Sequence, residues 1–337
     1  MKKFTIKDIA RLANVSTATV SRVINNYPFI HKKTRKKVQD IILQVDYQPN
    51  ATARSLATNK SRMIGVIVWD LGSLFFSEIV QEIGKECRKR GYQPIFCSTE
   101  GKNEIQEEYI NLLRQENIEG FLIATANLSD PQIEKLVLQD SPPVVLIDRT
   151  LQTELASSVT VDNEQGAYLA VKHLIEHGHR RIACVTGPEN SSSGLGRIQG
   201  YQKALLEKKI PIDRQLIIPG NFLRESGYHA AKKIISLKAE KSTAIFCSND
   251  CMALGIMEFF SNQGIRIPQD FSLIGFDDIS IASFSFIQLS TIDSRKIEVV
   301  RTAIDLLFQK IVDPNNKRVY RKKLLPKLVI RKTCGCP

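Results

Sequence analysis

Apolar positions near the start of the chain follow a helical spacing that is interrupted twice. Three groups with that spacing follow one another: Ile6, Ile9, Ala10 and Ala13; Val20, Val23 and Ile24; and Val38, Ile41, Ile42 and Val45. Thr5 and Asp8 have the spacing of a capping box, Ser16 can cap a second helix, and a third helix is expected after Thr34. Three short helices around a small aliphatic core predict a helix-turn-helix unit.

After residue 62 the pattern changes to short apolar runs that alternate with amphipathic segments. Strands are predicted at residues 64–68, 94–97, 121–124, 144–147, 182–185, 244–247 and 273–275. Helical spacing follows the first two strands, at Phe76, Ile79, Val80, Ile83 and Cys87, and then at Ile105, Tyr109, Leu112 and Leu113. Alternating strands and helices predict parallel sheets covered on both faces. The 277 residues after Lys60 exceed one comfortable core, so we expect an α/β body of two doubly wound lobes.

Positive charge is concentrated in the first sixty residues. They hold 12 Lys or Arg and 3 Asp or Glu, a net charge of +9 out of +12 for the whole chain. A basic head on a nearly neutral body is typical of a module that binds a polyanion, and DNA is the obvious one. The second helix presents Thr17, Ala18, Ser21 and Arg22 opposite its apolar face, and this set suits a major groove. An ordinary solvated helix face is the alternative, which the clustered charge disfavours.

The order of motifs along the chain resembles the lactose and galactose repressor (LacI/GalR) family of bacterial transcription regulators. In the head the matching segments are 5–23, Thr34-Arg35, Val38, 47–50 and 53–56. In the body they are 64–68, 143–149, Asp162-Asn163, Gly166-Ala167, Arg197, Gly200-Tyr201, 248–250, Met252-Ala253 and 275–278. The resemblance covers essentially the whole chain, and it implies a helix-turn-helix head joined to a periplasmic-binding-protein-like core.

The resemblance also implies the boundaries of these parts. The expected parts are a DNA-binding domain at 1–48, a hinge helix at 49–60, and an effector-binding and dimerisation core at 61–337. The expected lobes of the core are 61–162 with 293–322, and 163–292 with 323–337. The hinge would order only on DNA, and Leu56 would enter the minor groove as a wedge between base pairs.

Double-stranded operator DNA is the partner that the head implies. The residues expected to contact it are Thr5, Ser16, Thr17, Ala18, Thr19, Ser21, Arg22, Asn25, Thr34, Asn50, Ala53, Arg54 and Leu56. A homodimer would place two recognition helices in successive major grooves of a pseudo-palindromic site. Closure of the two lobes on an effector would change the spacing of the paired hinges, which couples the two binding events.

Polar residues follow four of the predicted strands and predict a ligand site. Asp70, Asp148, Asn249 and Asp277 come just after strands, and ligands of doubly wound lobes bind beyond the carboxyl ends of the strands. Carboxylates accept hydrogen bonds from hydroxyl groups, arginine donates several, and phenylalanine can cover a sugar ring. The residues expected to bind an effector, partly from the resemblance, are Phe75, Phe76, Asp148, Arg197, Phe222, Asn249 and Asp277. The effector is therefore expected to be a sugar or a sugar derivative.

Acidic residues after strands have an alternative role as helix caps and turn formers. We interpret Asp250 and Asp278 in that way, and we expect Arg197 to supply donors only to a ligand. Trp69 stands where the family usually has proline, and Ser73-Leu74 stands where it usually has Asn-Pro. Both departures lie near the expected mouth of the site and leave the identity of the effector open.

Enzyme and cofactor motifs are not found in the sequence, and neither catalysis nor a cofactor is expected. His173, His177 and His179 have metal-like spacing without a fitting carboxylate, so structural roles are expected and no metal. Glycines 194, 196 and 200 do not fit a dinucleotide fingerprint, and no phosphate-binding loop or nucleophile elbow occurs. Scattered cysteines, no signal peptide and no long apolar segment predict a cytoplasmic protein without membrane contact.

We therefore predict a sequence-specific transcription regulator under effector control, with repression as the expected sense. One alternative is a catabolite-control regulator whose corepressor is a phosphorylated carrier protein. Another is a sugar-binding receptor, which would need an export signal and has no use for a basic head. The sequence leaves open whether the effector releases or promotes DNA binding.

Overall fold

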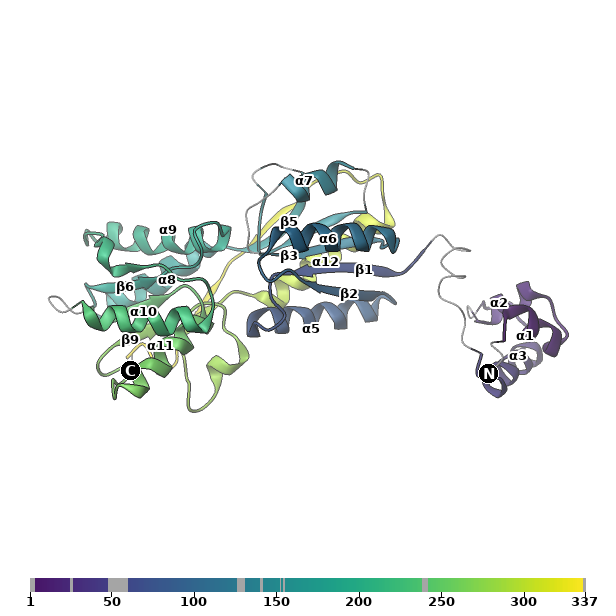
Figure 1. Cartoon of the computed structure of the whole chain (residues 1–337), viewed down its shortest axis with the longest axis horizontal. Helices are drawn as coiled ribbons and strands as arrows, with labels where there is room; N and C mark the ends of the chain where they lie inside the picture. The colour runs from purple at the N-terminus through teal and green to yellow at the C-terminus, as the bar shows by residue number, and fades with distance from the viewer. Residues whose placement is uncertain are drawn as a thin grey trace. The chain divides into compact units, whose positions relative to one another are not determined.

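The computed structural model describes residues 4–24, 27–47, 60–125, 131–139, 142–151, 153, 155–237 and 242–335. The chain divides into two compact units, Met1–Arg62 and Met63–Pro337, each with its own apolar core (Figure 1). The predicted hinge helix at 49–60 lies outside the described residues except for residue 60. Within the described part of the chain, no helix is long and apolar enough to span a membrane.

Three helices form the head: α1 (Ile6–Ala13), α2 (Thr17–Ile24) and α3 (Lys32–Gln44). The predicted capping box is confirmed, since Thr5 N donates to Asp8 Oδ2 at 2.9 Å and Asp8 N donates to Thr5 Oγ1 at 3.4 Å. Asn14 adopts the left-handed conformation with φ 52° and ends α1. Ser16 Oγ accepts from Thr19 N at 3.1 Å, so the predicted cap of α2 is also confirmed.

The third helix begins earlier than predicted and buries little of its own surface. Its N-cap is His31, whose Nδ1 accepts a hydrogen bond from Lys33 N at 3.3 Å, so the expected start after Thr34 is wrong. The buried core of the head consists of Ile9, Ala10, Ala13, Val20, Val23 and Val38. The remaining predicted core residues of α3, Ile41, Ile42 and Val45, are only partly buried against it. The head therefore depends on a few aliphatic side chains from three helices.

The first lobe of the larger unit is built on a six-stranded sheet with the order β11-β5-β4-β3-β1-β2, in which all pairs are parallel. The strands are β1 (Met63–Val68), β2 (Gln93–Ser98), β3 (Gly120–Ala124), β4 (Val144–Ile147), β5 (Ser157–Val161) and β11 (Arg321–Leu324). The helices are α5 (Leu74–Lys89), α6 (Asn103–Gln115), α7 (Pro131–Leu138) and α12 (Lys296–Val312). Figure 1 shows α5 and α6 on opposite sides of the strands, as a doubly wound sheet requires.

The second lobe contains a four-stranded parallel sheet with the order β7-β6-β8-β9. Its strands are β6 (Ile182–Val185), β7 (Ile217–Ile218), β8 (Ala244–Cys247) and β9 (Ser272–Ile274). Its helices are α8 (Asn163–Glu176), α9 (Ser192–Glu207), α10 (Arg224–Ser236) and α11 (Asp250–Asn262), with short 3-10 turns at Arg214–Leu216 and Ser280–Ser283. A separate antiparallel pair joins β10 (Thr291–Asp293) to β12 (Lys327–Val329) next to the points where the chain passes between the lobes.

The seven predicted strands are confirmed, each end lying within one residue of the prediction. The strands β5, β7, β10 and β11 were not predicted. The expected lobe boundary near residue 322 falls within β11, the whole of which pairs with β5, from Arg321 opposite Ser158 to Leu324 opposite Val161. The chain therefore leaves the first lobe only after Leu324.

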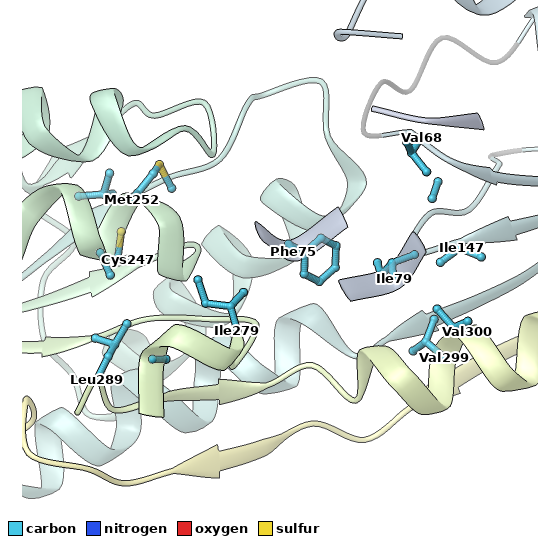
Figure 2. Close-up of a cluster of buried hydrophobic side chains, with 14 of the residues drawn as sticks. Val68, Phe75, Ile79, Ile147, Cys247, Met252, Ile279, Leu289, Val299 and Val300 are labelled. Carbon is cyan, nitrogen blue, oxygen red and sulfur yellow. The ribbon is translucent and has the colours of Figure 1, made fainter. Parts of the chain in front are cut away.

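An apolar cluster continues from one lobe into the other around Phe75. Figure 2 shows Phe75 between Ile79 and Ile147 of the first lobe and Met252 and Ile279 of the second. The side chain of Phe75 is 9% exposed. Because Phe75 lies in the first turn of α5, the start of this helix is fixed by packing against both lobes.

The separation of the two cores predicts a local effect for a change in the head. Ile9→Ala should destabilise the head by about 2–5 kcal/mol, because it leaves a cavity in a very small core where Ile9 is 0% exposed. Hydrogen exchange measured by mass spectrometry should show lost protection in peptides from residues 4–47 and unchanged protection after residue 63.

Leu43→Ala provides the matched control on α3, since Leu43 is 80% exposed and its loss should change protection little. Equal loss of protection in both units of the Ile9→Ala variant would show that head and body unfold together.

Candidate effector cavity and DNA-binding head

The strand ends of the two lobes meet at one cavity. Asp70 follows β1, Asp148 follows β4, Asn249 follows β8 and Asp277 follows β9, and all four line this cavity. The structure brings all the residues predicted to bind an effector to its wall: Phe75, Phe76, Asp148, Arg197, Phe222, Asn249 and Asp277. Their binding role stays a prediction, but the expectation that the strand ends converge on one site agrees with this geometry.

Trp69, Thr125 and Ser193 are among the lining residues that were not predicted to bind an effector. Trp69 follows β1, Thr125 follows β3, and Ser193 lies in the first turn of α9. The same strand-end argument that pointed to Asp70 could have found Trp69 and Thr125. Ser193 carried no such signal, because the local pattern does not say that the start of α9 points at the strand ends.

Arg197 is buried and already hydrogen-bonded within the second lobe. Its side chain is 3% exposed, its Nε donates to Asn163 Oδ1 at 2.8 Å, and its Nη2 donates to Asp277 Oδ1 at 3.0 Å. Nη1 donates to the carbonyl of Ser248, and the guanidinium lies 3.8 Å from the ring centre of Phe276. The expectation that Arg197 supplies donors only to a ligand is therefore wrong. The arginine joins α8, α9 and the ends of β8 and β9, and only its remaining N–H groups are available to an effector.

Asn249, and not Asp250, caps α11. Asn249 is the N-cap of α11, with Oδ1 accepting from Met252 N at 2.9 Å and Nδ2 donating to the carbonyl of Phe222 at 2.9 Å. Asp250 is fully buried and accepts from Thr291 Oγ1 at 2.6 Å and from Ile279 N at 3.0 Å. The interpretation of Asp250 as a cap is therefore wrong, because the cap is one residue earlier.

Asp278 likewise has a structural partner at a distance along the chain. Its Oδ1 accepts from Arg331 Nη2 at 2.7 Å, so it forms an ion pair rather than a helix cap. Both acidic residues hold the second lobe together, as expected of residues outside the ligand site, but through contacts that lie far away in the sequence.

Two of the three carboxylates that line the cavity, Asp148 and Asp277, are electrostatically linked. Burial raises the pKa of Asp277 to about 6, an effect that Arg197 opposes and the neighbouring Asp148 reinforces. Burial also raises the pKa of Asp148, and Arg197 together with a hydrogen bond from Asn163 opposes that shift. Both residues have positive φ, 54° for Asp148 and 110° for Asp277, and so does Phe222 with 69°. Backbone strain of this kind persists where the surrounding structure fixes it, and it often occurs at functional sites.

In the head, the face of α2 opposite the core is open to solvent. Thr17, Ala18 and Arg22 are exposed, and Ser21 is partly exposed. The guanidinium carbon of Arg22 lies 5.7 Å from the ring centre of Tyr27, a cation–π distance, and the residue stays exposed. The geometry is compatible with the predicted recognition face.

The other predicted DNA-contacting residues divide into two groups. Thr5 and Ser16 are exposed, and Thr19 and Thr34 are partly exposed; the hydroxyls of Ser16 and Thr19 are 2.9 Å apart. Asn25, Asn50, Ala53, Arg54 and Leu56 lie outside the described residues, so their predicted contacts stay predictions.

The three histidines that have metal-like spacing make local contacts. His177 Nδ1 lies 2.8 Å from the carbonyl of His173, and His179 Nδ1 lies 2.8 Å from Thr243 Oγ1. Among the described residues, no group of three or more His, Cys, Asp or Glu is placed to hold a metal ion.

A basic helix-turn-helix head and a two-lobed core with a cavity at its strand ends define a class of bacterial regulator, and comparisons with known proteins agree. Residues 5–50 match the family model for bacterial regulatory proteins of the lacI family. Residues 61–333 match the model for periplasmic binding proteins and the sugar binding domain of the LacI family. The chain belongs to the LacI family and is a DNA-binding transcription regulator.

Individual relatives match over nearly the whole chain. The HTH-type transcriptional repressor PurR of Vibrio atlanticus (strain LGP32) is 40% identical over 330 residues, which are 98% of each protein. The Lac repressor dimer bound to operator and the anti-inducer ONPF aligns with a TM-score of 0.87 at 30% identity, covering 99% of this chain and 100% of that one. A cellobiose complex of the transcriptional regulator CelR aligns with a TM-score of 0.74 at 27% identity, covering 98% and 99%.

The buried position of Arg197 predicts that its loss destabilises the core. Arg197→Ala should lower the free energy of unfolding by about 3–5 kcal/mol at neutral pH, because the Asp277 carboxylate stays buried without its cation. The loss should shrink toward pH 5, since the pKa of Asp277 is about 6 and its protonated form needs no cation. Urea unfolding at several pH values measures both effects.

The matched control is Arg224→Ala, because Arg224 is 51% exposed and pairs at the surface with Glu258. Its loss should change the free energy of unfolding little at either pH. Equal losses for the two arginines would contradict a structural role of Arg197, and Asp277→Asn should recover part of the stability that Arg197→Ala removes.

Proposed function

We propose that this protein is a dimeric, operator-binding repressor whose DNA affinity is controlled by a small polar effector bound in the cavity between the lobes. The observation that carries the proposal is the convergence of Asp70, Asp148 and Asp277 with Trp69 and Phe222 on one cavity, on the same chain as a basic recognition helix. Residues from both lobes line this cavity, so an effector there would contact both of them at once. Such a ligand can bias the arrangement of the lobes and thereby the DNA affinity.

The donor and acceptor chemistry of the cavity favours a sugar. Three carboxylates line it, and an ionised carboxylate only accepts hydrogen bonds, so the best ligand is rich in hydroxyl donors. Aromatic rings on the same wall can cover the apolar face of a sugar ring. Cellobiose in the CelR complex shows that one relative with this fold binds a sugar.

A nucleobase is the second candidate, because aromatic rings also stack on flat heterocycles. Trp69, Phe76 and Phe222 are all on the cavity wall. A base offers fewer N–H donors than a sugar offers hydroxyls, so some of the carboxylate oxygens would accept no hydrogen bond from it. A phosphorylated carrier protein as corepressor stays an alternative prediction without support from the cavity.

For the DNA side, we propose that the exposed face of α2 enters the major groove and that two copies of the chain bind a pseudo-palindromic operator. The Lac repressor structure contains a dimer bound to its operator, which supports this arrangement for the family. The hinge helix with Leu56 as a minor-groove wedge remains part of the proposal on the strength of the sequence motif alone.

Substitution of Arg22 tests whether the exposed face of α2 reads the operator sequence. Arg22→Ala should weaken operator binding by about 1–3 kcal/mol and relax the preference at one base pair, if the guanidinium pairs with a guanine. The control is Lys33→Ala on α3, which should weaken all DNA sequences alike through a lost phosphate contact. Competition binding against operators mutated at each position measures both patterns. A uniform loss for Arg22→Ala would assign it to the DNA backbone instead.

The effector class is tested by thermal shift of the full chain with monosaccharides, sugar phosphates and purine bases. Sugars should raise the melting temperature and change operator affinity, because their hydroxyls satisfy the three carboxylates. Asp277→Asn should remove most of the shift, since a neutral amide accepts less strongly. Stabilisation by purine bases and not by sugars would overturn the sugar assignment and leave the cavity as the effector site. If no small molecule changes operator affinity, the proposed control by an effector is wrong.

A further inference from the structure

Trp69 makes an aromatic contact across the cavity, from the first lobe to the second. It follows β1, and its backbone N–H donates to the carbonyl of Ala124 at 3.1 Å, which continues the sheet by one residue. Its ring meets the ring of Phe222, which precedes α10 in the second lobe, edge to face at 6.3 Å between centroids. On the other side it meets Phe76 of α5, also edge to face at 6.3 Å. The contact between Trp69 and Phe222 thus joins the two lobes through residues that are far apart in the sequence.

Each of the two rings is seated against a glycine. A Cβ atom on Gly101, whose φ is +74°, would lie 2.2 Å from Trp69 Nε1. A Cβ atom on Gly187 would lie 2.2 Å from Phe222 Cζ. Real Cβ atoms do not approach other atoms this closely, so each ring occupies space that only glycine leaves free. The close approach of backbone at Gly101 and Gly187 limits the movement of each ring on that side.

Phe222 is further held by its own backbone contacts. Its φ of 69° is unusual for a residue with a bulky side chain. The carbonyl of Phe222 accepts from Asn249 Nδ2 at 2.9 Å, and the Arg197 guanidinium lies 5.6 Å from its ring centre. The cap of α11 therefore also fixes the loop that presents this ring.

The exposure of the lining residues separates an inner from an outer part of the cavity. Arg197, Asn249 and Asp277 are 2%, 5% and 4% exposed, whereas Trp69 and Phe222 are both partly exposed. Arg197, Asn249 and Asp277 therefore form the buried end of the cavity, and the two rings, like Asp70 and Asp148, lie nearer to solvent. A ligand whose hydroxyls reach Asp277 has its outer end beside Trp69 and Phe222.

We propose that Trp69 selects effectors by size and restricts the cavity to a single sugar ring. A monosaccharide can place its hydroxyls on the inner carboxylates and its apolar face against the aromatic rings. A second sugar ring would project toward solvent and meet the contact between Trp69 and Phe222, in which each ring is packed against a glycine. A steric clash is an ordinary source of specificity, because it lowers the affinity for the larger ligand without raising the affinity for the smaller one. The proposal rests on the proposed function, because it requires a sugar effector in this cavity.

The test compares monosaccharides with disaccharides on the full chain. Isothermal titration with glucose, galactose and ribose, and with cellobiose and lactose, should show that the parent protein prefers a monosaccharide by about tenfold or more. Trp69→Ala removes the wall and should reduce this preference by at least about tenfold, chiefly by strengthening disaccharide binding. A far-UV circular dichroism spectrum and a urea midpoint close to those of the parent protein show that Trp69→Ala is folded, independently of any ligand.

Gly101→Ala provides a second, independent perturbation, because the added methyl group displaces Trp69 while leaving its side chain present. Gly264→Ala is the matched control, since Gly264 has a similar φ of +67° but open space around its missing Cβ. Both variants carry the same backbone strain, but only Gly101→Ala should change monosaccharide affinity. It should also change the tryptophan emission spectrum, which reports on Trp69 alone because the chain has one tryptophan.

The outcomes separate this proposal from the proposed function. A parent protein that binds disaccharides as tightly as monosaccharides, or a Trp69→Ala variant with an unchanged preference, overturns size selection and leaves the sugar effector in place. If Gly101→Ala and Gly264→Ala change monosaccharide affinity equally, the packing of Trp69 against Gly101 has no role in binding, and that part of the proposal is wrong. If neither the parent nor Trp69→Ala binds any of these sugars, the sugar effector itself is wrong, and the size selection proposed for it is wrong as well.

Discussion

A guanidinium group that is almost fully buried has to be paired and hydrogen-bonded, because an isolated buried charge costs several kcal/mol. Arg197 meets this condition through Asn163 at the start of α8, the carbonyl of Ser248 after β8, and the carboxylate of Asp277 after β9. Four segments of the second lobe are thereby held at fixed positions around one charge. The inner wall of the cavity follows from this arrangement. Burial of the Asp277 carboxylate raises its pKa, and the pairing with Arg197 opposes that rise.

Asp277 is also linked to the first lobe, through its backbone. Lys296 at the start of α12 donates to the carbonyl of Asp277 at 3.0 Å and pairs with Glu78 of α5 at 3.2 Å. Glu78 also accepts from Ser280 N of the second lobe at 2.7 Å. A ligand that contacts the side chain of Asp277 therefore acts on a residue whose main chain is tied to both lobes. Coupling between the cavity and the arrangement of the lobes has a physical route through these contacts.

The cavity combines this fixed polar interior with a fixed aromatic wall. Positive φ values at Asp148, Phe222 and Asp277 place strained backbone around it, and the surrounding hydrogen bonds and packing maintain the strain. A preorganised site of this kind loses little side-chain freedom on binding, which favours affinity and selectivity for one ligand shape. The head has a different physical basis, since its function depends on exposed cationic and polar groups over a small aliphatic core.

The sequence by itself determined the three head helices, the capping box of Thr5 and Asp8, the central strands and the strand-end residues of the site, because these follow from local periodicity and chain direction. Tertiary structure alone decided which donor meets which acceptor. It made Asn249 rather than Asp250 the cap of α11, paired Arg197 with groups of its own lobe, and brought the ring of Trp69 against that of Phe222. It also recruited β11, a charged segment without an apolar pattern, into the first sheet. Such outcomes depend on contacts between residues that are distant in the chain, and no local pattern of residue types specifies them.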